Sequence, residues 1–208
     1  MASENSSQVL VGVSGHRPNR MFRGSEDPYS EENFLILKDF AVGCLEHLRQ
    51  VWPVSSVYSG MALGVDQAFA AAALELGIPL VAVIPFLGQE MAWHAQDRKR
   101  YQALVEAAAD RIVLSGVGYS PEKLRQRSRW IVDHTDLDLF VYDSSRFGGT
   151  AETWAYALSK GKRMYNFWVK WQDHWAAVLR NAELPTITQL PPLVQMPASG
   201  RASKPHSF

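Results

Sequence analysis

The residues best suited to chemistry lie between Arg127 and Glu152, in the stretch RSRWIVDHTDLDLFVYDSSRFGGTAE. This stretch is typical of the end of a helix, a buried strand, a glycine turn and the start of another helix. That order brings a cation, a carboxylate and the free backbone N–H groups of a helix start to one edge of a sheet. Such an edge is suited to holding a phosphorylated ligand.

Arg127 and Glu152 are expected to meet although they are far apart in the chain. The strand predicted at 137–142 advances about 20 Å, and eight residues of the preceding helix return about 12 Å. The arginine side chain then reaches the far end of the strand, where residues 148–152 read GGTAE. The alternative is that Arg125, Arg127 and Arg129 form a solvated helix face, which we expect of one or two of them.

The same sheet edge supplies the expected ligand-binding groups of this region. Backbone N–H groups at the helix start would cradle a phosphate, and a threonine would add a hydroxyl. Gly148, Gly149 and Thr150 are assigned to this role, and Asp143 is predicted as a further ligand-binding residue.

A second candidate segment follows the first predicted strand, QVLVGV at 8–13. It contains a hydroxyl, a glycine and two possible phosphate donors, in Ser14, Gly15, His16 and Arg17. The segment could be an ordinary exposed loop. Because open α/β sheets bind ligands directly after such strands, we favour a binding role.

A third candidate segment, GMALGVD at 60–66, lies between a strand at 55–59 and an alanine-rich helix. Gly60 and Gly64 let the backbone turn sharply, which leaves helix N–H groups facing an anion. The spacing matches neither a dinucleotide-binding fingerprint nor a Walker A loop. Asp66 could accept a ribose hydroxyl or cap its own helix, and Trp93 could stack on a base or simply pack.

Composition narrows the class of partner. Lysine and arginine total 21, as do aspartate and glutamate, so no global field attracts nucleic acid or an anionic membrane. The one cysteine, Cys44, excludes an internal disulfide and fits a reducing compartment. With no signal peptide, no apolar run of about 20 residues and no metal-ligand spacing, we expect a soluble cytoplasmic protein without metal or cofactor.

Predicted strands and helices alternate along the chain. This pattern favours an α/β fold with a mostly parallel sheet of about six strands and helices on both faces. Residues 1–184 are expected to form one domain. Residues 185–208 are rich in proline and serine and lack periodicity, so we expect a mobile or loosely docked tail.

Three segments in order resemble the SLOG superfamily, which includes the Smf/DprA and lonely-guy proteins. They are SGHR, SGMALGVD and VDHTDLDLFVYDSSRFGGTAE, and the resemblance covers about residues 9–167, closest to the YpsA-like branch. It implies a modified Rossmann fold that binds a nucleotide or a nucleotide-derived ligand at the carboxyl edge of the sheet.

The lonely-guy members are phosphoribohydrolases, and the resemblance implies the matching activity here, an N-glycosidase acting on a nucleoside 5'-monophosphate. Arg127 lies nine residues before Asp136, and Gly149 to Glu152 match the GTxE of their motif. Arg127 and Glu152 would form the catalytic pair. The sequence departs from the motif at Ser128, Phe147 and Thr153.

Two other functions stay open. A non-catalytic sensor of an ADP-ribose-like or other nucleotide signal would use the same turns, with Glu152 on a ribose hydroxyl. Single-stranded DNA binding is disfavoured by the balanced charge and by the lack of a basic, aromatic-rich stripe. Relatives in the superfamily suggest a homodimer.

Overall fold

The computed structural model describes residues 8–196. Its six strands form a single parallel sheet in the order β4-β3-β2-β1-β5-β6. The strands are β1 (Val9–Gly15), β2 (Val54–Ser59), β3 (Leu80–Ile84), β4 (Asp110–Val113), β5 (Leu137–Val141) and β6 (Arg163–Asn166). The predicted fold class is therefore confirmed.

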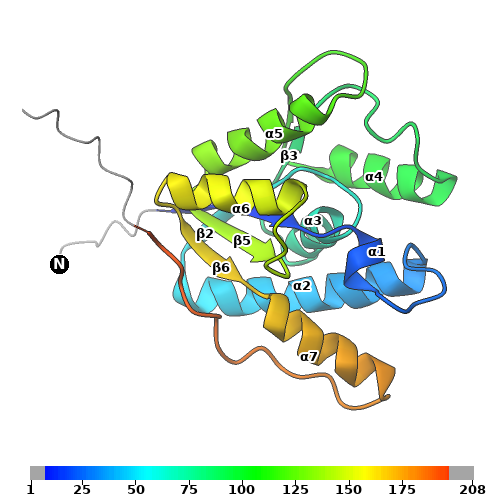
Figure 1. Cartoon of the computed structure of the whole chain (residues 1–208), viewed down its shortest axis with the longest axis vertical. Coiled ribbons are helices and arrows are strands. Elements are labelled where there is room, and N and C mark those ends of the chain that lie inside the picture. Colours follow the sequence, from blue (N-terminus) through cyan, green and yellow to red (C-terminus); the bar gives the residue numbers. More distant parts are fainter. Residues whose placement is uncertain (1–7, 197–208) are drawn as a thin grey trace, which may run out of the picture.

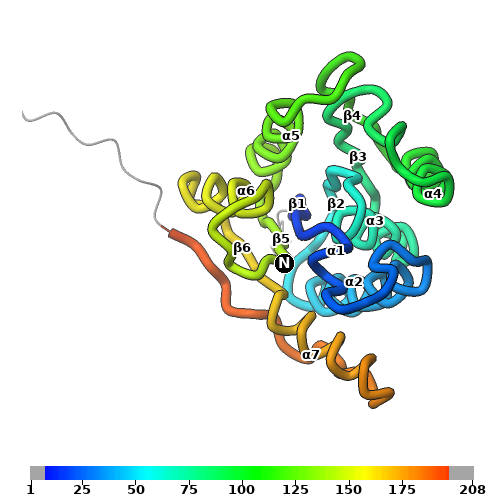
Figure 2. The backbone as a smooth tube through the Cα atoms, turned by 45° about the vertical axis from the view of Figure 1, so that its right-hand side comes forward, coloured from blue at the N-terminus to red at the C-terminus, as the bar shows by residue number. Residues whose placement is uncertain are grey.

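Helices cover both faces of this sheet. They are α1 (Pro18–Met21), α2 (Glu31–Val51), α3 (Val65–Glu75), α4 (Ala95–Ala107), α5 (Pro121–His134), α6 (Gly149–Ser159) and α7 (Trp168–Leu179). Figure 1 shows α5 and α6 on one face and α2 and α7 on the other. In Figure 2, α3 and α4 lie on the same side as α2. The largest core cluster lies between the sheet and the α2, α3 and α7 layer.

The order of the strands places a crossover point between β1 and β5. The chain starts at β1, moves outward through β2, β3 and β4, and then returns to the other side of β1 as β5. The loops that leave the carboxyl ends of β1 and β5 therefore diverge to opposite faces. A parallel sheet binds ligands in the crevice that such divergence opens.

Local sequence explains where the helices beside this crevice begin. Ser120 accepts a hydrogen bond from the N–H of Glu122, and Pro121 occupies the first position of α5. Gly148 precedes α6 with φ 106°, a conformation that favours glycine. The glycine turn therefore fixes the point at which the α6 N-terminus faces the sheet edge.

The short helix α1 was not predicted, because the segment between the first strand and Tyr29 is polar and has no long periodicity. Pro18 starts it, and Met21 and Phe22 then enter the main core. Phe22 meets Trp171 and Trp175 of α7 edge-on, with ring centroids 5.3 and 5.1 Å apart. These contacts anchor the segment after β1 to α7.

Residues 185–196, part of the tail that the sequence predicted to be mobile or loosely docked, run back to β6. Met164 of β6 and Val194 exchange two backbone hydrogen bonds, of 2.9 and 2.8 Å, in an antiparallel bridge. Ile187 and Leu190 pack against the main core. The remainder of the predicted tail, 197–208, lies outside the described residues. Across residues 8–196, no helix combines the length and apolar character needed to cross a membrane.

Candidate functional site

A pocket of about 440 Å³ opens at the carboxyl ends of β1 and β5. This volume lies in the range of roughly 300–1,000 Å³ that is usual for small-molecule sites. Its walls come from the β1–α1 loop, the starts of α3 and α6, and the first half of α5. The predicted residues that line it are Ser14, Gly15, His16, Arg17, Asp66, Arg127, Gly148, Gly149, Thr150 and Glu152.

The α6 N-terminus provides the anion-binding backbone of this pocket. The N–H of Glu152 is bonded to Gly148 O at 3.0 Å, so the helix ladder begins there and the amides before it face outward. The Thr150 hydroxyl donates to Gly15 O at 3.0 Å, which ties the start of α6 to the end of β1. The wall of the pocket is thus a fixed edge with unused amide donors.

Cations outnumber carboxylates along the pocket wall. Five arginines line it, Arg17, Arg20, Arg125, Arg127 and Arg129, against the two carboxylates of Asp66 and Glu152. Within residues 8–196, Arg17 makes no side-chain hydrogen bond or ion pair, although it comes from the loop that directly follows β1. The pocket therefore carries an excess of positive charge that an anionic ligand would balance.

Arg127 is buried and pairs with Asp66, not with Glu152 as its spacing suggested. Its Nη1 lies 2.9 Å from Asp66 Oδ2, and the two residues are 7% and 5% exposed. The guanidinium fills the space beside Gly60, where an added Cβ would lie 1.1 Å from Nη1. A buried cation needs a charged partner, and Asp66 is the carboxylate that the α3 start supplies.

Glu152 is held by Arg125 instead. Arg125 Nε donates to Glu152 Oε2 at 2.9 Å, and its Nη1 donates to Glu122 Oε2 at 3.2 Å. The hydrogen bonds that Arg125 donates to these two carboxylates, the one to Glu152 first, raise the pKa of Arg125. Both partners of the pair line the pocket, so Glu152 stands beside a cation there, though a different one from the residue predicted.

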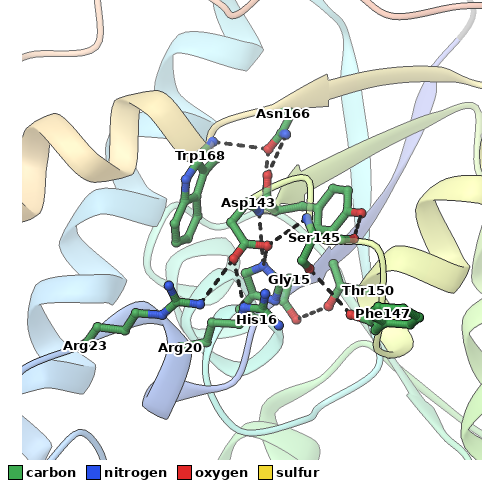
Figure 3. A network of polar contacts seen from close by, with 11 residues as sticks. Gly15, His16, Arg20, Arg23, Asp143, Ser145, Phe147, Thr150, Asn166 and Trp168 are labelled. Atoms are coloured by element: carbon green, nitrogen blue, oxygen red, sulfur yellow. Dashed lines mark hydrogen bonds and ion pairs between the residues drawn. The ribbon is translucent and has the colours of Figure 1, made fainter.

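His16 and Asp143 form a polar network beside the pocket (Figure 3). Nε2 of His16 lies 2.8 Å from Asp143 Oδ1, and Arg20 Nε donates to Oδ2 at 2.8 Å. Burial lowers the pKa of His16. Burial also acts to raise the pKa of Asp143, but hydrogen bonds from Ser145 and Arg20 outweigh it and hold that pKa well below its usual value.

This network changes the expected roles of both residues. Asp143 does not line the pocket, because His16, Arg20 and Ser145 already occupy its oxygens. His16 lines the pocket, but its Nε2 is turned to Asp143, so it acts as a brace between the β1 and β5 loops. Arg20, which the sequence did not single out, joins this brace to the pocket wall.

Three other predicted ligand residues lie outside the pocket wall. Gly60 makes room for Arg127, as described above. Gly64 has φ 95°, and a Cβ there would lie 2.5 Å from His16 O, so it serves close packing of α3 against the β1 loop. Trp93 packs edge-on against Tyr101 with centroids 5.5 Å apart, in the cluster beneath α4, which agrees with the packing alternative for this residue.

Several lining residues were not predicted as binding groups. Arg125 is two positions from Arg127, and its partner Glu122 at i−3 was the available sequence signal. Phe147 lies in the glycine turn and is 85% exposed. Pro121 and Leu124 of α5 line the same pocket. An aromatic residue inside a glycine turn, without a core to fill, is the signal that marks it.

Comparison of sequences identifies relatives of this chain. A UPF0398 protein of Lactobacillus helveticus (strain DPC 4571) is 29% identical over 166 residues, covering 77% of this chain and 80% of its own. The SPbeta prophage-derived protein YoqJ of Bacillus subtilis (strain 168) is 28% identical over 130 residues, covering 55% of this chain and 76% of its own.

Among solved structures, DNA processing protein A (DprA) from Streptococcus pneumoniae matches with a TM-score of 0.50 and 21% identity, over 86% of this chain and 59% of that one. At this identity the likeness concerns the fold alone. The YpsA family model, described as the YspA SLOG family, matches residues 11–171, a range that contains every lining residue of the pocket. This chain therefore belongs to the YpsA family of SLOG proteins.

Proposed function

We propose that this protein binds a nucleoside 5'-monophosphate or a related nucleotide in the pocket between β1 and β5. The observation that carries the proposal is the excess of arginine beside the free amides of the α6 N-terminus. A phosphate there would accept hydrogen bonds from Gly149 and Thr150 N–H and would meet Arg17, which has a free guanidinium among the described residues.

The apolar part of the same wall suits a planar base. Phe147 is 85% exposed and lines the pocket together with Pro121 and Leu124. Stacking on an aromatic ring is tolerant of base identity, since every base has a π face. A base held there would leave the ribose near Glu152, between the apolar wall and the phosphate site.

The reaction that this arrangement supports is hydrolysis of the N-glycosidic bond. Water adds its oxygen to ribose C1' as the C1'–N bond breaks, and the bonding electrons and one proton leave with the base. Glu152 would stabilise the positive charge that develops at C1' or orient the attacking water. Arg125 would keep the carboxylate directed into the pocket through the 2.9 Å contact.

Binding without catalysis is the second candidate, and one observation favours it. Arg127, the expected catalytic partner, is committed to Asp66, and Glu152 is committed to Arg125. In a nucleotide sensor these pairs would shape the pocket, and Glu152 would accept a hydrogen bond from a ribose hydroxyl. Single-stranded DNA binding is less favoured, because the arginines surround a pocket of limited volume and do not follow an open groove.

One experiment separates these functions. Thermal unfolding in the presence of a panel of nucleoside mono- and diphosphates identifies ligands, since a compound that binds the native state raises Tm. Prolonged incubation with each stabilising ligand, followed by chromatography, then detects a released base. Release supports the N-glycosidase, and an intact ligand after tight binding supports the sensor. If no nucleotide raises Tm, the proposal fails.

A further inference from the structure

Asp138 is a buried carboxylate that the proposed reaction does not use. It is the second residue of β5, is 3% exposed, and its Oδ1 accepts a hydrogen bond from the Thr135 hydroxyl at 2.9 Å. Gly12 is its neighbour on β1, and a Cβ at Gly12 would lie 2.3 Å from Oδ1. β1 thus carries a glycine beside Asp138, and a side chain at that position would clash with the carboxylate.

One oxygen of this carboxylate and one nitrogen of Arg127 are buried and lack protein partners in the described part of the chain. Across residues 8–196, neither Oδ2 of Asp138 nor Nε of Arg127 has a hydrogen-bond partner. Both side chains line a small cavity of about 10 Å³ that shares Ser14, Asp66 and Ser128 with the ligand pocket. That volume is near the smallest that holds one water molecule. A water there can accept a hydrogen bond from Arg127 Nε and donate one to Asp138 Oδ2.

We propose that one enclosed water bridges Arg127 Nε and Asp138 Oδ2, which makes Asp138 a positioning residue for Arg127 and links its protonation to the ligand pocket. The link to a ligand rests on the proposed function, whereas the water bridge itself does not. Leaving both atoms unpaired would cost their full desolvation, and a shared water removes this cost.

The protonation of Asp138 changes the charge beneath the pocket. Burial raises the pKa of Asp138 to about 7, although the Thr135 hydrogen bond and the Lys162 ammonium act to lower it. The other charged groups that act on it are Asp133 and Asp136, which raise it, and the Arg127–Asp66 pair adjoins the same cavity. Protonated Asp138 therefore adds no charge beside the neutral Arg127–Asp66 pair, and ionised Asp138 adds a second carboxylate to the cavity that Arg127 and Asp66 line.

The direction of the effect on binding follows from this charge. As pH rises through about 7, a buried negative charge appears below a site that holds an anion, so anion affinity falls. Asp138→Asn mimics the protonated form, because its amide can still donate to the water but cannot ionise. Sulfate is the probe, since its own charge is constant over this range.

The expected result is a pH-dependent difference between the two proteins. Sulfate affinity of the wild type should fall by about fivefold or more between pH 6 and 8, relative to Asp138→Asn at the same pH. The control is Asp110→Asn, the same change at an exposed position on β4. If wild type and Asp138→Asn keep a constant affinity ratio over this range, the link is wrong.

A second measurement needs no ligand. A folded-state pKa above the unfolded value of about 3.9 means that the native state binds the extra proton, so the stability contribution is complete below pH 4 and is lost as pH rises to about 7. Urea unfolding of the wild type should show this decline, and Asp138→Asn should not. Equal slopes in the two proteins would overturn the assignment of a raised pKa.

The water bridge is tested directly by a high-resolution crystal structure. A water within hydrogen-bond distance of Arg127 Nε and Asp138 Oδ2 supports the proposal, and a dry cavity overturns it. If Asp138→Asn fails to fold, carbon NMR titration of the carboxyl group in the wild type still reports its protonation. If the crystal structure shows the water and Asp138 titrates near pH 7 but no nucleotide binds, the proposed function is wrong and the water bridge stands.

Discussion

Arg125 and Arg127 divide two carboxylates between them: Arg125 Nε lies 2.9 Å from Glu152, and Arg127 Nη1 lies 2.9 Å from Asp66. They are two residues apart on α5, so their side chains leave the helix in different directions. The exposed pair stands in the ligand pocket, while the buried pair joins α5 to the start of α3. Both pairs line the pocket, but only the Arg127–Asp66 pair is shielded from solvent, so we expect the two arginines to differ most in their contribution to stability.

Replacing Glu152 by glutamine tests the reactive carboxylate. If the protein is an N-glycosidase, Glu152→Gln should slow base release by a factor of about 10²–10³, because the charge at C1' loses its stabilising partner. Nucleotide affinity should change much less. The measurement is base release from a saturating nucleoside monophosphate, followed by chromatography.

Glu122→Gln is the matched control, since Glu122 also bonds Arg125, at 3.2 Å, but does not line the pocket. It should leave base release within about twofold of the wild type, because exposed salt bridges contribute little. Equal losses in the two variants would mean that the charge on Arg125, and not Glu152 itself, matters.

Removing Arg127 should destabilise the protein strongly. Arg127→Met leaves the Asp66 carboxylate buried without its cation, and breaking a buried pair in this way costs about 3–5 kcal/mol. The double variant with Asp66→Asn should recover part of this loss. Urea unfolding of the wild type, Arg127→Met, Asp66→Asn and the double variant gives the coupling. The control Arg129→Met, at an exposed position on the same helix, should cost less than about 1 kcal/mol.

Gly60→Ala should disrupt the same buried pair by pushing the Arg127 guanidinium out of its place. The new methyl would lie 1.1 Å from Nη1, so the guanidinium must leave its place beside Asp66. Unfolding free energy should fall by about 2 kcal/mol or more, as expected when a buried pair is disrupted. Gly116→Ala, where no atom lies within 4 Å of the added methyl, is the control. A Gly60→Ala protein as stable as this control would contradict the packing described.

Phe147→Ala should weaken nucleotide binding without affecting small anions. Loss of one stacked base costs about 1–3 kcal/mol, whereas inorganic phosphate makes no stacking contact. Calorimetry with a nucleoside monophosphate and with phosphate measures both effects, and Phe147→Trp should preserve affinity. A similar loss for the two ligands would show that the variant disturbs the glycine turn instead of a base site.

The sequence was sufficient to predict the alternation of strands and helices. Buried strands such as 80–84 are continuous apolar runs, and caps such as Ser120-Pro121 mark helix starts, so local chemistry determined these elements. The short helix α1 was missed because Met21, its last residue, and Phe22, directly after it, are too few apolar residues to form a stripe. Their burial depends on Trp171, about 150 residues away.

The sequence was sufficient to predict which segments form the candidate site. It was not sufficient to predict which arginine pairs with which carboxylate. Chain lengths predicted that Arg127 and Glu152 approach one sheet edge, and both residues line the pocket there. The choice of partner depended on the space beside Gly60 and on Asp66, both distant in sequence from α5. Trp93 shows the same limit, since its packing against Tyr101 follows from the position of α4 over β3.

The bridge between Met164 and Val194 also affects how copies of this chain can associate. Figure 1 shows the segment that contains Val194 running beside β6, so this lateral border of the sheet already has a partner. β4 forms the opposite border, and in the described part of the chain it has a strand on one side only. Any intermolecular β-sheet, whether a regulated assembly or an aggregate, should therefore grow from Asp110–Val113.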